Sequence, residues 1–176
     1  MNYVRTTAML VLLVCGSSIE PGIAEGDERY RSREQETVET ILATFLNENG
    51  LDERGLPLMM RLPDAAREHL PLAVWRMRKD GVPEDACTRV LLHLMQHEPR
   101  AYYRGQAAAF LGYTGDPRVV DALIGELKHE NQFVRNQACA ALGRIGDPQA
   151  VDAIVLLLTD TSHHCRNNAV EALGRL

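Results

Sequence analysis

The chain has 176 residues, of which 45% are hydrophobic and 24% charged, a composition typical of a globular protein. Its formal net charge is −5, and its basic residues alternate with acidic ones. Nucleic acids and anionic membranes are bound through concentrated positive charge, so both are disfavoured as partners. Aromatic residues make up only 5%, and Ala and Leu dominate the last third, which favours closely packed helices.

The first 24 residues have the features of an export signal. Arg5 is the one positive charge ahead of a short apolar stretch, Ala8–Val14. Gly22 and Ala24 then supply the small residues that a signal peptidase reads before it cleaves ahead of Glu25. The stretch is too short to span a bilayer, so we expect export to the bacterial periplasm or the cell exterior.

Two alternatives compete with cleavage after Ala24. The stretch 12–15 resembles a lipoprotein box, which would attach lipid to Cys15, although Val14 stands where such a box has Gly, Ala or Ser. The other alternative is a buried amino-terminal helix.

Removing residues 1–24 leaves three cysteines, Cys87, Cys139 and Cys165. An odd number does not form a disulfide framework, so we expect buried free thiols.

Polar residues fill 25–36, which predicts a linker. Apolar residues at three- and four-residue spacing predict an amphipathic helix over 37–47. After an irregular stretch, 52–63, we expect helices over 64–79 and 84–97. The apolar face of the last of these contains Ala86, Val90, Leu91 and Leu94.

From Tyr103 the sequence repeats with a period of 31 residues and no gaps. The copies span 103–133 and 134–164, and a third copy begins over 165–176. Arg, Gly and Asp-Pro recur in register between the copies. The recurring residues are Arg104, Arg135, Arg166; Gly112, Gly143, Gly174; Asp116-Pro117, Asp147-Pro148; and Asp121, Asp152.

Each copy predicts two short helices around a tight turn. Gly115 and Gly146 end the first helix, where a left-handed backbone suits Gly. The Asp-Pro pair then caps and begins the second helix. We expect the second helices to give the core Val120, Leu123, Ile124 and Leu127, and then Val151, Ile154, Val155 and Leu158. A single hairpin cannot bury its apolar faces, so the hairpins must stack.

The pattern V-R-x-x-A-x-x-A-L-G-x-x-G-D-P-x-A-V-x-x-L resembles HEAT-like repeats of the phycobilisome-lyase type. The resemblance covers 103–176 well and 64–102 as a degenerate leading repeat, where Gly81-Val82-Pro83 replaces Gly-Asp-Pro. It implies an all-α fold, an α-α superhelix of helical hairpins with an amino-terminal helical extension. The implied domains are a signal peptide (1–24), a polar linker and helical region (25–63) and a repeat domain (64–176).

Deoxyhypusine hydroxylase resembles this chain in architecture and binds iron through His-Glu pairs placed directly after the Val-Arg. The corresponding positions hold other residues, which excludes that ligand set. They are Gly105-Gln106, Asn136-Gln137 and Asn167-Asn168.

The remaining metal-ligand types lie outside those positions. His97-Glu98 and His129-Glu130 fall at the ends of second helices, where we expect solvated polar residues. In the run 163–165 (His-His-Cys), three adjacent residues cannot all face one ion, so loop and core roles are favoured. Trp75, Tyr102 and Tyr103 are too scattered to define a chromophore pocket. We therefore expect no catalytic, metal-binding or cofactor-binding residues.

Two interpretations of the recurring arginines remain open, an anion-binding ladder and a structural pairing with Asp121 and Asp152. Because Arg and Asp recur together, we favour the structural pairing. Positions that differ between copies beside the constant ones are the candidates for contact with a partner protein. They are Gly105, Gln106, Asn136, Gln137, Asn167 and Asn168.

The sequence thus predicts an exported, non-catalytic scaffold or adaptor that binds another protein. The alternative is an accessory subunit of a lyase or other modifying enzyme that binds a small molecule or metal. The last helix carries Ala169, Val170, Ala172 and Leu173 with no second helix after it. Either this surface binds a partner or the chain is a shortened array.

Overall fold

The computed structural model describes residues 70–79 and 83–176, and contacts divide the chain into two compact units, 1–82 and 83–176. The export signal, Cys15, the polar linker and the helix expected over 37–47 lie outside the described residues. In the first unit, α5 (Leu70–Lys79) falls within the helix predicted over 64–79. The boundary between the units lies inside 64–102, which the repeat pattern had grouped as one degenerate copy.

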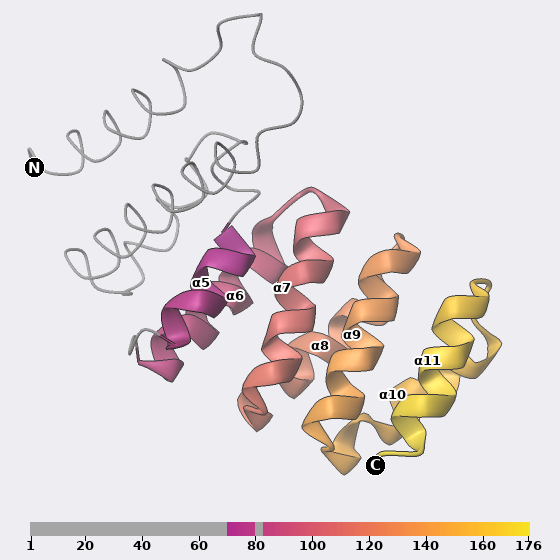
Figure 1. The fold of residues 1–176 in the computed structure, drawn as a ribbon. Helices are drawn as coiled ribbons and strands as arrows, with labels where there is room; N and C mark the ends of the chain where they lie inside the picture. Colours follow the sequence, from indigo (N-terminus) through magenta and orange to yellow (C-terminus); the bar gives the residue numbers. More distant parts are fainter. Residues whose placement is uncertain (1–69, 80–82) are drawn as a thin grey trace, which may run out of the picture. The chain divides into compact units, whose positions relative to one another are not determined.

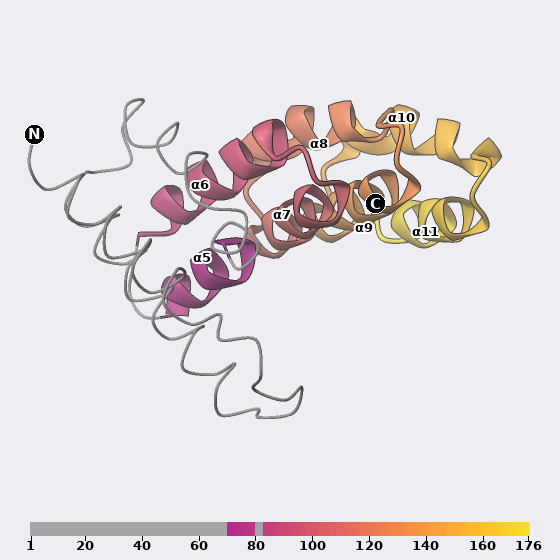
Figure 2. The same ribbon diagram turned by 90° about the horizontal axis from the view of Figure 1, so that it is seen from above.

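The second unit is built from helices in two layers. Its elements are α6 (Glu84–His97), α7 (Ala101–Thr114), η1 (Pro117–Val119), α8 (Val120–Glu126), α9 (Gln132–Ile145), η2 (Pro148–Ala150), α10 (Val151–Leu156), η3 (Leu157–Thr159) and α11 (His163–Leu173). Seen from above, α7, α9 and α11 form one row, and α6, α8 and α10 form the other (Figure 2). The described residues contain helices and turns but no strand, so the fold is all-α as predicted.

The predicted turn between first and second helices is confirmed in both complete copies. Gly115 and Gly146 have φ angles of 67° and 75°, the left-handed conformation that favours Gly. Asp116 and Asp147 each accept a hydrogen bond at 2.9 Å from the backbone N–H two residues on. The prolines after them begin short 3₁₀ turns, which lead into α8 and α10.

First helices lie side by side because the recurring glycines carry no side chain (Figure 1). A Cβ on Gly112 would lie 2.5 Å from Cα of Ala141, and one on Gly143 would lie 2.7 Å from Cα of Ala172. Backbone cannot move aside as a flexible side chain can, so these positions accept only Gly. At Gly174 a Cβ would meet nothing closer than two carbonyl oxygens of its own helix, at 3.5 Å.

The core follows the repeat pattern with one exception in the last second helix. Val120, Leu123, Leu127 and Ile154 are buried as expected, and Ile124 and Val151 are half-buried. Val155 and Leu158, however, are 44% and 38% exposed. Instead, Leu157 is buried. The physical reason for the exchange of Leu158 for Leu157 is that α10 ends at Leu156 and continues as η3, in which each residue turns further about the axis than in an α-helix.

The burial of individual side chains tests three further expectations, which concern the apolar face of α6, the cysteines and the surface of α11. The apolar face predicted for α6 is buried, and so are Cys87, Cys139 and Cys165, of which Cys139 and Cys165 are free thiols, as predicted. On α11, Ala169 and Ala172 are buried against the array and Leu173 is half-buried, so of the four apolar residues only Val170 is mostly exposed, at 63%. No helix among the described residues has the length and apolar character needed to cross a membrane.

Candidate interaction site

The recurring arginines bind acceptors within the array. Arg104 donates from Nε and Nη2 to the carboxylate of Glu126 at 2.7 and 2.5 Å, and Arg135 binds Asp160 in the same two-pronged way at 2.8 and 2.9 Å. Arg166 donates from Nη1 to the backbone carbonyls of Asp160 and Thr161. Bidentate pairs of this kind fix the position of both side chains, so these arginines connect segments of the fold.

The expected pairing of the arginines with Asp121 and Asp152 is wrong. Asp121 accepts a hydrogen bond from Nε2 of Gln149 in the next copy, at 2.6 Å, and Asp152 is exposed. Both aspartates lie in the first turn of their helices, whereas the carboxylates that reach the arginines lie near the ends of the second helices. The hydrogen bond from Arg135 is the main reason that the pKa of Asp160 lies below its ordinary value.

The positions proposed for partner contact do not all face outward. Gly105 is buried, because the ring of Phe133 lies where its side chain would be. Asn168 donates a hydrogen bond of 2.7 Å to the side chain of Asn136 across the α9–α11 contact, so these two residues join the repeats.

Two further positions of the set are partly covered and one is open. Gln106 is half-buried and donates from Nε2 to the hydroxyl of Tyr102 at 3.0 Å. Gln137 is half-buried beside Gly105, and Asn167 is exposed. The structure therefore brings together two pairs of the proposed set, Asn136 with Asn168 and Gly105 with Gln137.

A second row on the first helices was missed by the sequence analysis. It consists of Tyr113 on α7, Arg144 on α9 and Arg175 just after α11, which occupy one column of the repeat. Cζ of Arg144 lies 4.4 Å from the ring centroid of Tyr113, a cation–π contact between α7 and α9. The sequence does contain a signal for this row. A comparison of charge in every column that varies between copies, and not only in the columns directly after Val-Arg, would have found it.

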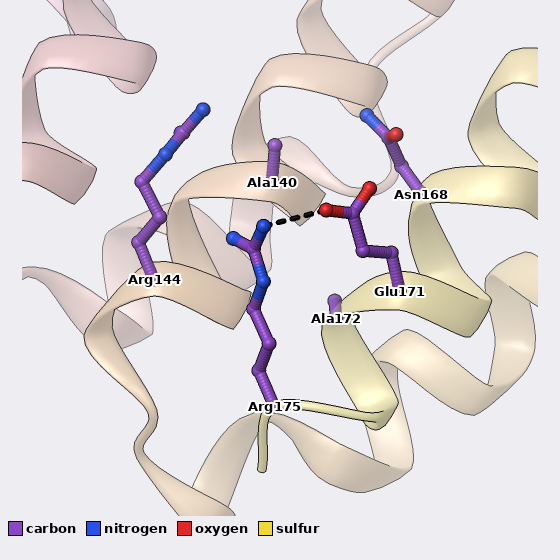
Figure 3. A pocket seen from close by; sticks show the side chains of 6 residues that line it. All are labelled: Ala140, Arg144, Asn168, Glu171, Ala172 and Arg175. Carbon is purple, nitrogen blue, oxygen red and sulfur yellow. Dashed lines mark hydrogen bonds and ion pairs between the residues drawn. The ribbon is translucent and has the colours of Figure 1, made fainter.

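A shallow hollow of about 110 Å³ lies along this row, between α9 and α11. In Figure 3 the guanidinium of Arg175 reaches toward the carboxylate of Glu171 next to Ala140, with Arg144 on one side and Asn168 on the other. Arg175 and Glu171 form an ion pair at 2.5 Å, with side chains 48% and 61% exposed. The hollow thus contains two guanidinium groups and one carboxylate.

The groups with metal-ligand or nucleophile chemistry are not assembled for it. His163 and His164 are exposed, whereas Cys165 is buried, so the three side chains do not converge. No cluster of three or more His, Cys, Asp or Glu in the described part of the chain is placed to hold a metal ion. Burial raises the pKa of the Cys139 thiol to about 12, which keeps it protonated at neutral pH.

Glu98 corrects another expectation. It is only 1% exposed, not solvated, because its carboxylate accepts hydrogen bonds from the backbone N–H and the Nε of Arg100. His97 and Glu130 are exposed, and Nδ1 of His129 accepts a hydrogen bond from the backbone N–H of Asn131 at 3.0 Å. These residues end second helices and form loops.

Two-layered stacks of helical hairpins, each contacting its neighbours, define an α-solenoid repeat protein. Residues 88–174 match the family model for HEAT repeats, and this part of the chain is therefore a HEAT-like repeat array. No curated protein sequence matches the chain.

Proposed function

We propose that this protein is an exported, non-catalytic scaffold that binds another protein through the outer face of α7, α9 and α11. The observation that carries the proposal is that different residues of these helices pack the repeats together and face solvent. Constant glycines and arginines hold the repeats together, while some of the residues that differ from copy to copy, among them Tyr113, Asn167 and Arg175, are exposed. HEAT-like arrays present layers of helices as extended binding surfaces for protein partners.

The test is recovery of a complex from the source cells. The tagged full-length chain, expressed at its native level, is purified at physiological salt and its molar mass measured by light scattering. We expect a complex of defined stoichiometry with a second polypeptide. A chain that is recovered alone at every concentration, from every cell fraction, would contradict the proposal.

A second candidate follows from the resemblance to the phycobilisome-lyase type of repeat, an accessory subunit of a modifying enzyme. That function requires a bound small molecule or metal. Absorption spectroscopy and metal analysis of the natively purified protein distinguish the two, because a stoichiometric chromophore or ion would favour the accessory subunit.

Export is part of the proposal and rests on the sequence of residues 1–24. We expect the mature protein to begin at Glu25, which intact-mass measurement of the native protein would reveal. A mature protein that begins at a lipidated Cys15 would instead place it on a membrane surface, and retention of Met1 would rule out cleavage.

A further inference from the structure

On one face of α9, a small residue lies between two polar ones. Along α9, Gln137, Ala140 and Arg144 follow each other at three- and four-residue spacing, which places them on one face of the helix. Asn168, Glu171 and Arg175 occupy the same columns in the next copy. Ala140 is thus a small residue between Gln137 and Arg144, and it lines the hollow.

Arg144 brings a positive charge to this hollow that no carboxylate neutralises. None of the ion pairs among residues 70–79 and 83–176 includes its guanidinium, and its buried Nη1 makes no hydrogen bond within them. The ring of Tyr113 lies against the guanidinium and restricts its rotamers. Arg144 therefore offers a fixed cation, which lowers the entropy lost when an anion binds.

Arg175 is neutralised only by a weak, local pair. Glu171 lies four residues before it, and both side chains are about half-exposed or more, so solvent screens their attraction. With Arg144, the hollow has a net charge of +1 on a chain whose net charge is −5. The ion pair between Glu171 and Arg175 shows that a side-chain carboxylate fits in the hollow.

We propose that this hollow binds an acidic peptide segment of a partner protein, with one Asp or Glu carboxylate seated between Arg144 and Arg175. This inference rests on the proposed scaffold function and adds the chemistry of the partner. The incoming carboxylate pairs with Arg144 and competes with Glu171 for Arg175. The uncharged neighbours in the adjoining row, Gln137 and Asn168, add no repulsion to an acidic chain.

Because the peptide carboxylate competes with Glu171 for Arg175, removing the charge of Glu171 should strengthen peptide binding by more than the loss of any other surface carboxylate would. A fluorescein-labelled peptide of alternating Glu and Ala is titrated with the full-length protein by anisotropy at low salt, beside a peptide with Gln for each Glu. We expect only the Glu peptide to bind. Arg144→Gln should weaken it roughly three- to tenfold, and Glu171→Gln should tighten it by about two- to fivefold.

Matched controls separate the site from net charge. Lys128→Gln removes one positive charge at an exposed position in the turn after α8, and Glu130→Gln removes one negative charge from an exposed loop. We expect each control to change affinity less than about twofold, because long-range effects at the surface are screened. Melting temperatures confirm that all four variants fold.

The proposal is overturned if the Glu peptide does not bind, or if each variant and its control have equal effects. It is also overturned if inorganic phosphate displaces the peptide at concentrations near the peptide's own Kd, which would identify a site for small free anions. The proposed scaffold function is tested by a different experiment, the recovery of a native complex, and can therefore fail or stand independently of this site. A native partner that binds Arg144→Gln and Glu171→Gln as tightly as wild type leaves the scaffold intact and refutes only the acidic segment.

Discussion

The α7–α9 and α9–α11 contacts are alike at one end and different at the other. At the shared end, Gly112 and Gly143 each lie against an Ala backbone of the next helix. At the other end, the α7–α9 contact is aromatic, because the ring of Phe133 covers Gly105 and stacks on Tyr102 with centroids 5.4 Å apart.

The α9–α11 contact is polar at the position where its neighbour is aromatic. Asn136 stands in the column of Gly105, where it accepts a hydrogen bond from Asn168, and His164 replaces Phe133 and is exposed. Variation between copies therefore does not by itself mark a ligand-binding position. Repeats can also vary where they contact each other, provided that each contact finds its own complementary pair.

The largest expected effect is at the shared end. Gly143→Val places a branched side chain against the backbone of Ala172, and we expect it to lower the free energy of unfolding by about 3 kcal/mol, because packed helices must separate. Gly174→Val is the control in the same column and should cost less than about 0.5 kcal/mol, as an ordinary surface substitution does. Urea denaturation measures both, and equal costs would contradict close packing at Gly143.

The next largest expected loss of stability comes from breaking the ion pair between Arg135 and Asp160 in the second copy. Asp160→Asn keeps the shape but removes the charge opposite Arg135, both side chains being nearly buried, so we expect a loss of about 2 kcal/mol at neutral pH. Asp152→Asn, exposed and equal in charge change, is the control and should have little effect.

The same pair predicts a pH dependence. The pKa of Asp160 in the folded protein is below its ordinary value of 3.8, so its contribution is complete above that value and is lost as pH falls through the folded pKa. The gap between wild type and Asp160→Asn should therefore close below pH 3.8. A gap that persisted unchanged through acid would assign the loss to something other than the ion pair.

The aromatic contact should contribute less than the arginine pair. Phe133→Ala removes a half-buried ring from Gly105 and Tyr102, and we expect a loss of roughly 1.5 kcal/mol. His164→Ala truncates the exposed residue of the same column and should change the thermal midpoint little. If the two substitutions were equal, the two contacts would not differ as described.

The polar contact should contribute least. Asn168→Ala deletes the bond to Asn136, for which we expect a loss of about 1 kcal/mol relative to Asn167→Ala on the exposed side of the same turn. Because both variants gain the same helix propensity, their difference isolates the bond. Indistinguishable unfolding curves would return Asn168 to the set of candidate partner-binding residues.

The sequence alone predicts the turns and the first-helix packing, because Gly-Asp-Pro and the Gly column are constant. It does not predict the arginine partners, since Glu126 stands in the column of Leu157, and Asp160 in that of His129. Each copy places its carboxylate at a different residue, which column-by-column comparison cannot detect. The exchange of Leu157 for Leu158 in the core has a similar origin, because it depends on where an α-helix changes to 3₁₀.

The candidate site depends on distances between helices more than on any motif. Arg144 is a candidate binding residue because of its neighbours, which are Tyr113 on the preceding helix and Arg175 and Glu171 on the other side of the hollow. No local pattern encodes those neighbours. Of the residues chosen from sequence, Asn168 borders the hollow, but it does so while bonded to Asn136.

The most direct test of the scaffold account is photo-crosslinking in the source cells, with a benzophenone amino acid placed at one of two positions. Gln137 lies on the outer face of α9, and Asp152 is exposed on α10 in the other layer. If a partner binds the first-helix face, we expect a covalent adduct with a second polypeptide from position 137 and none from position 152. An adduct from position 152 alone, or from neither position, would contradict binding through the first-helix face.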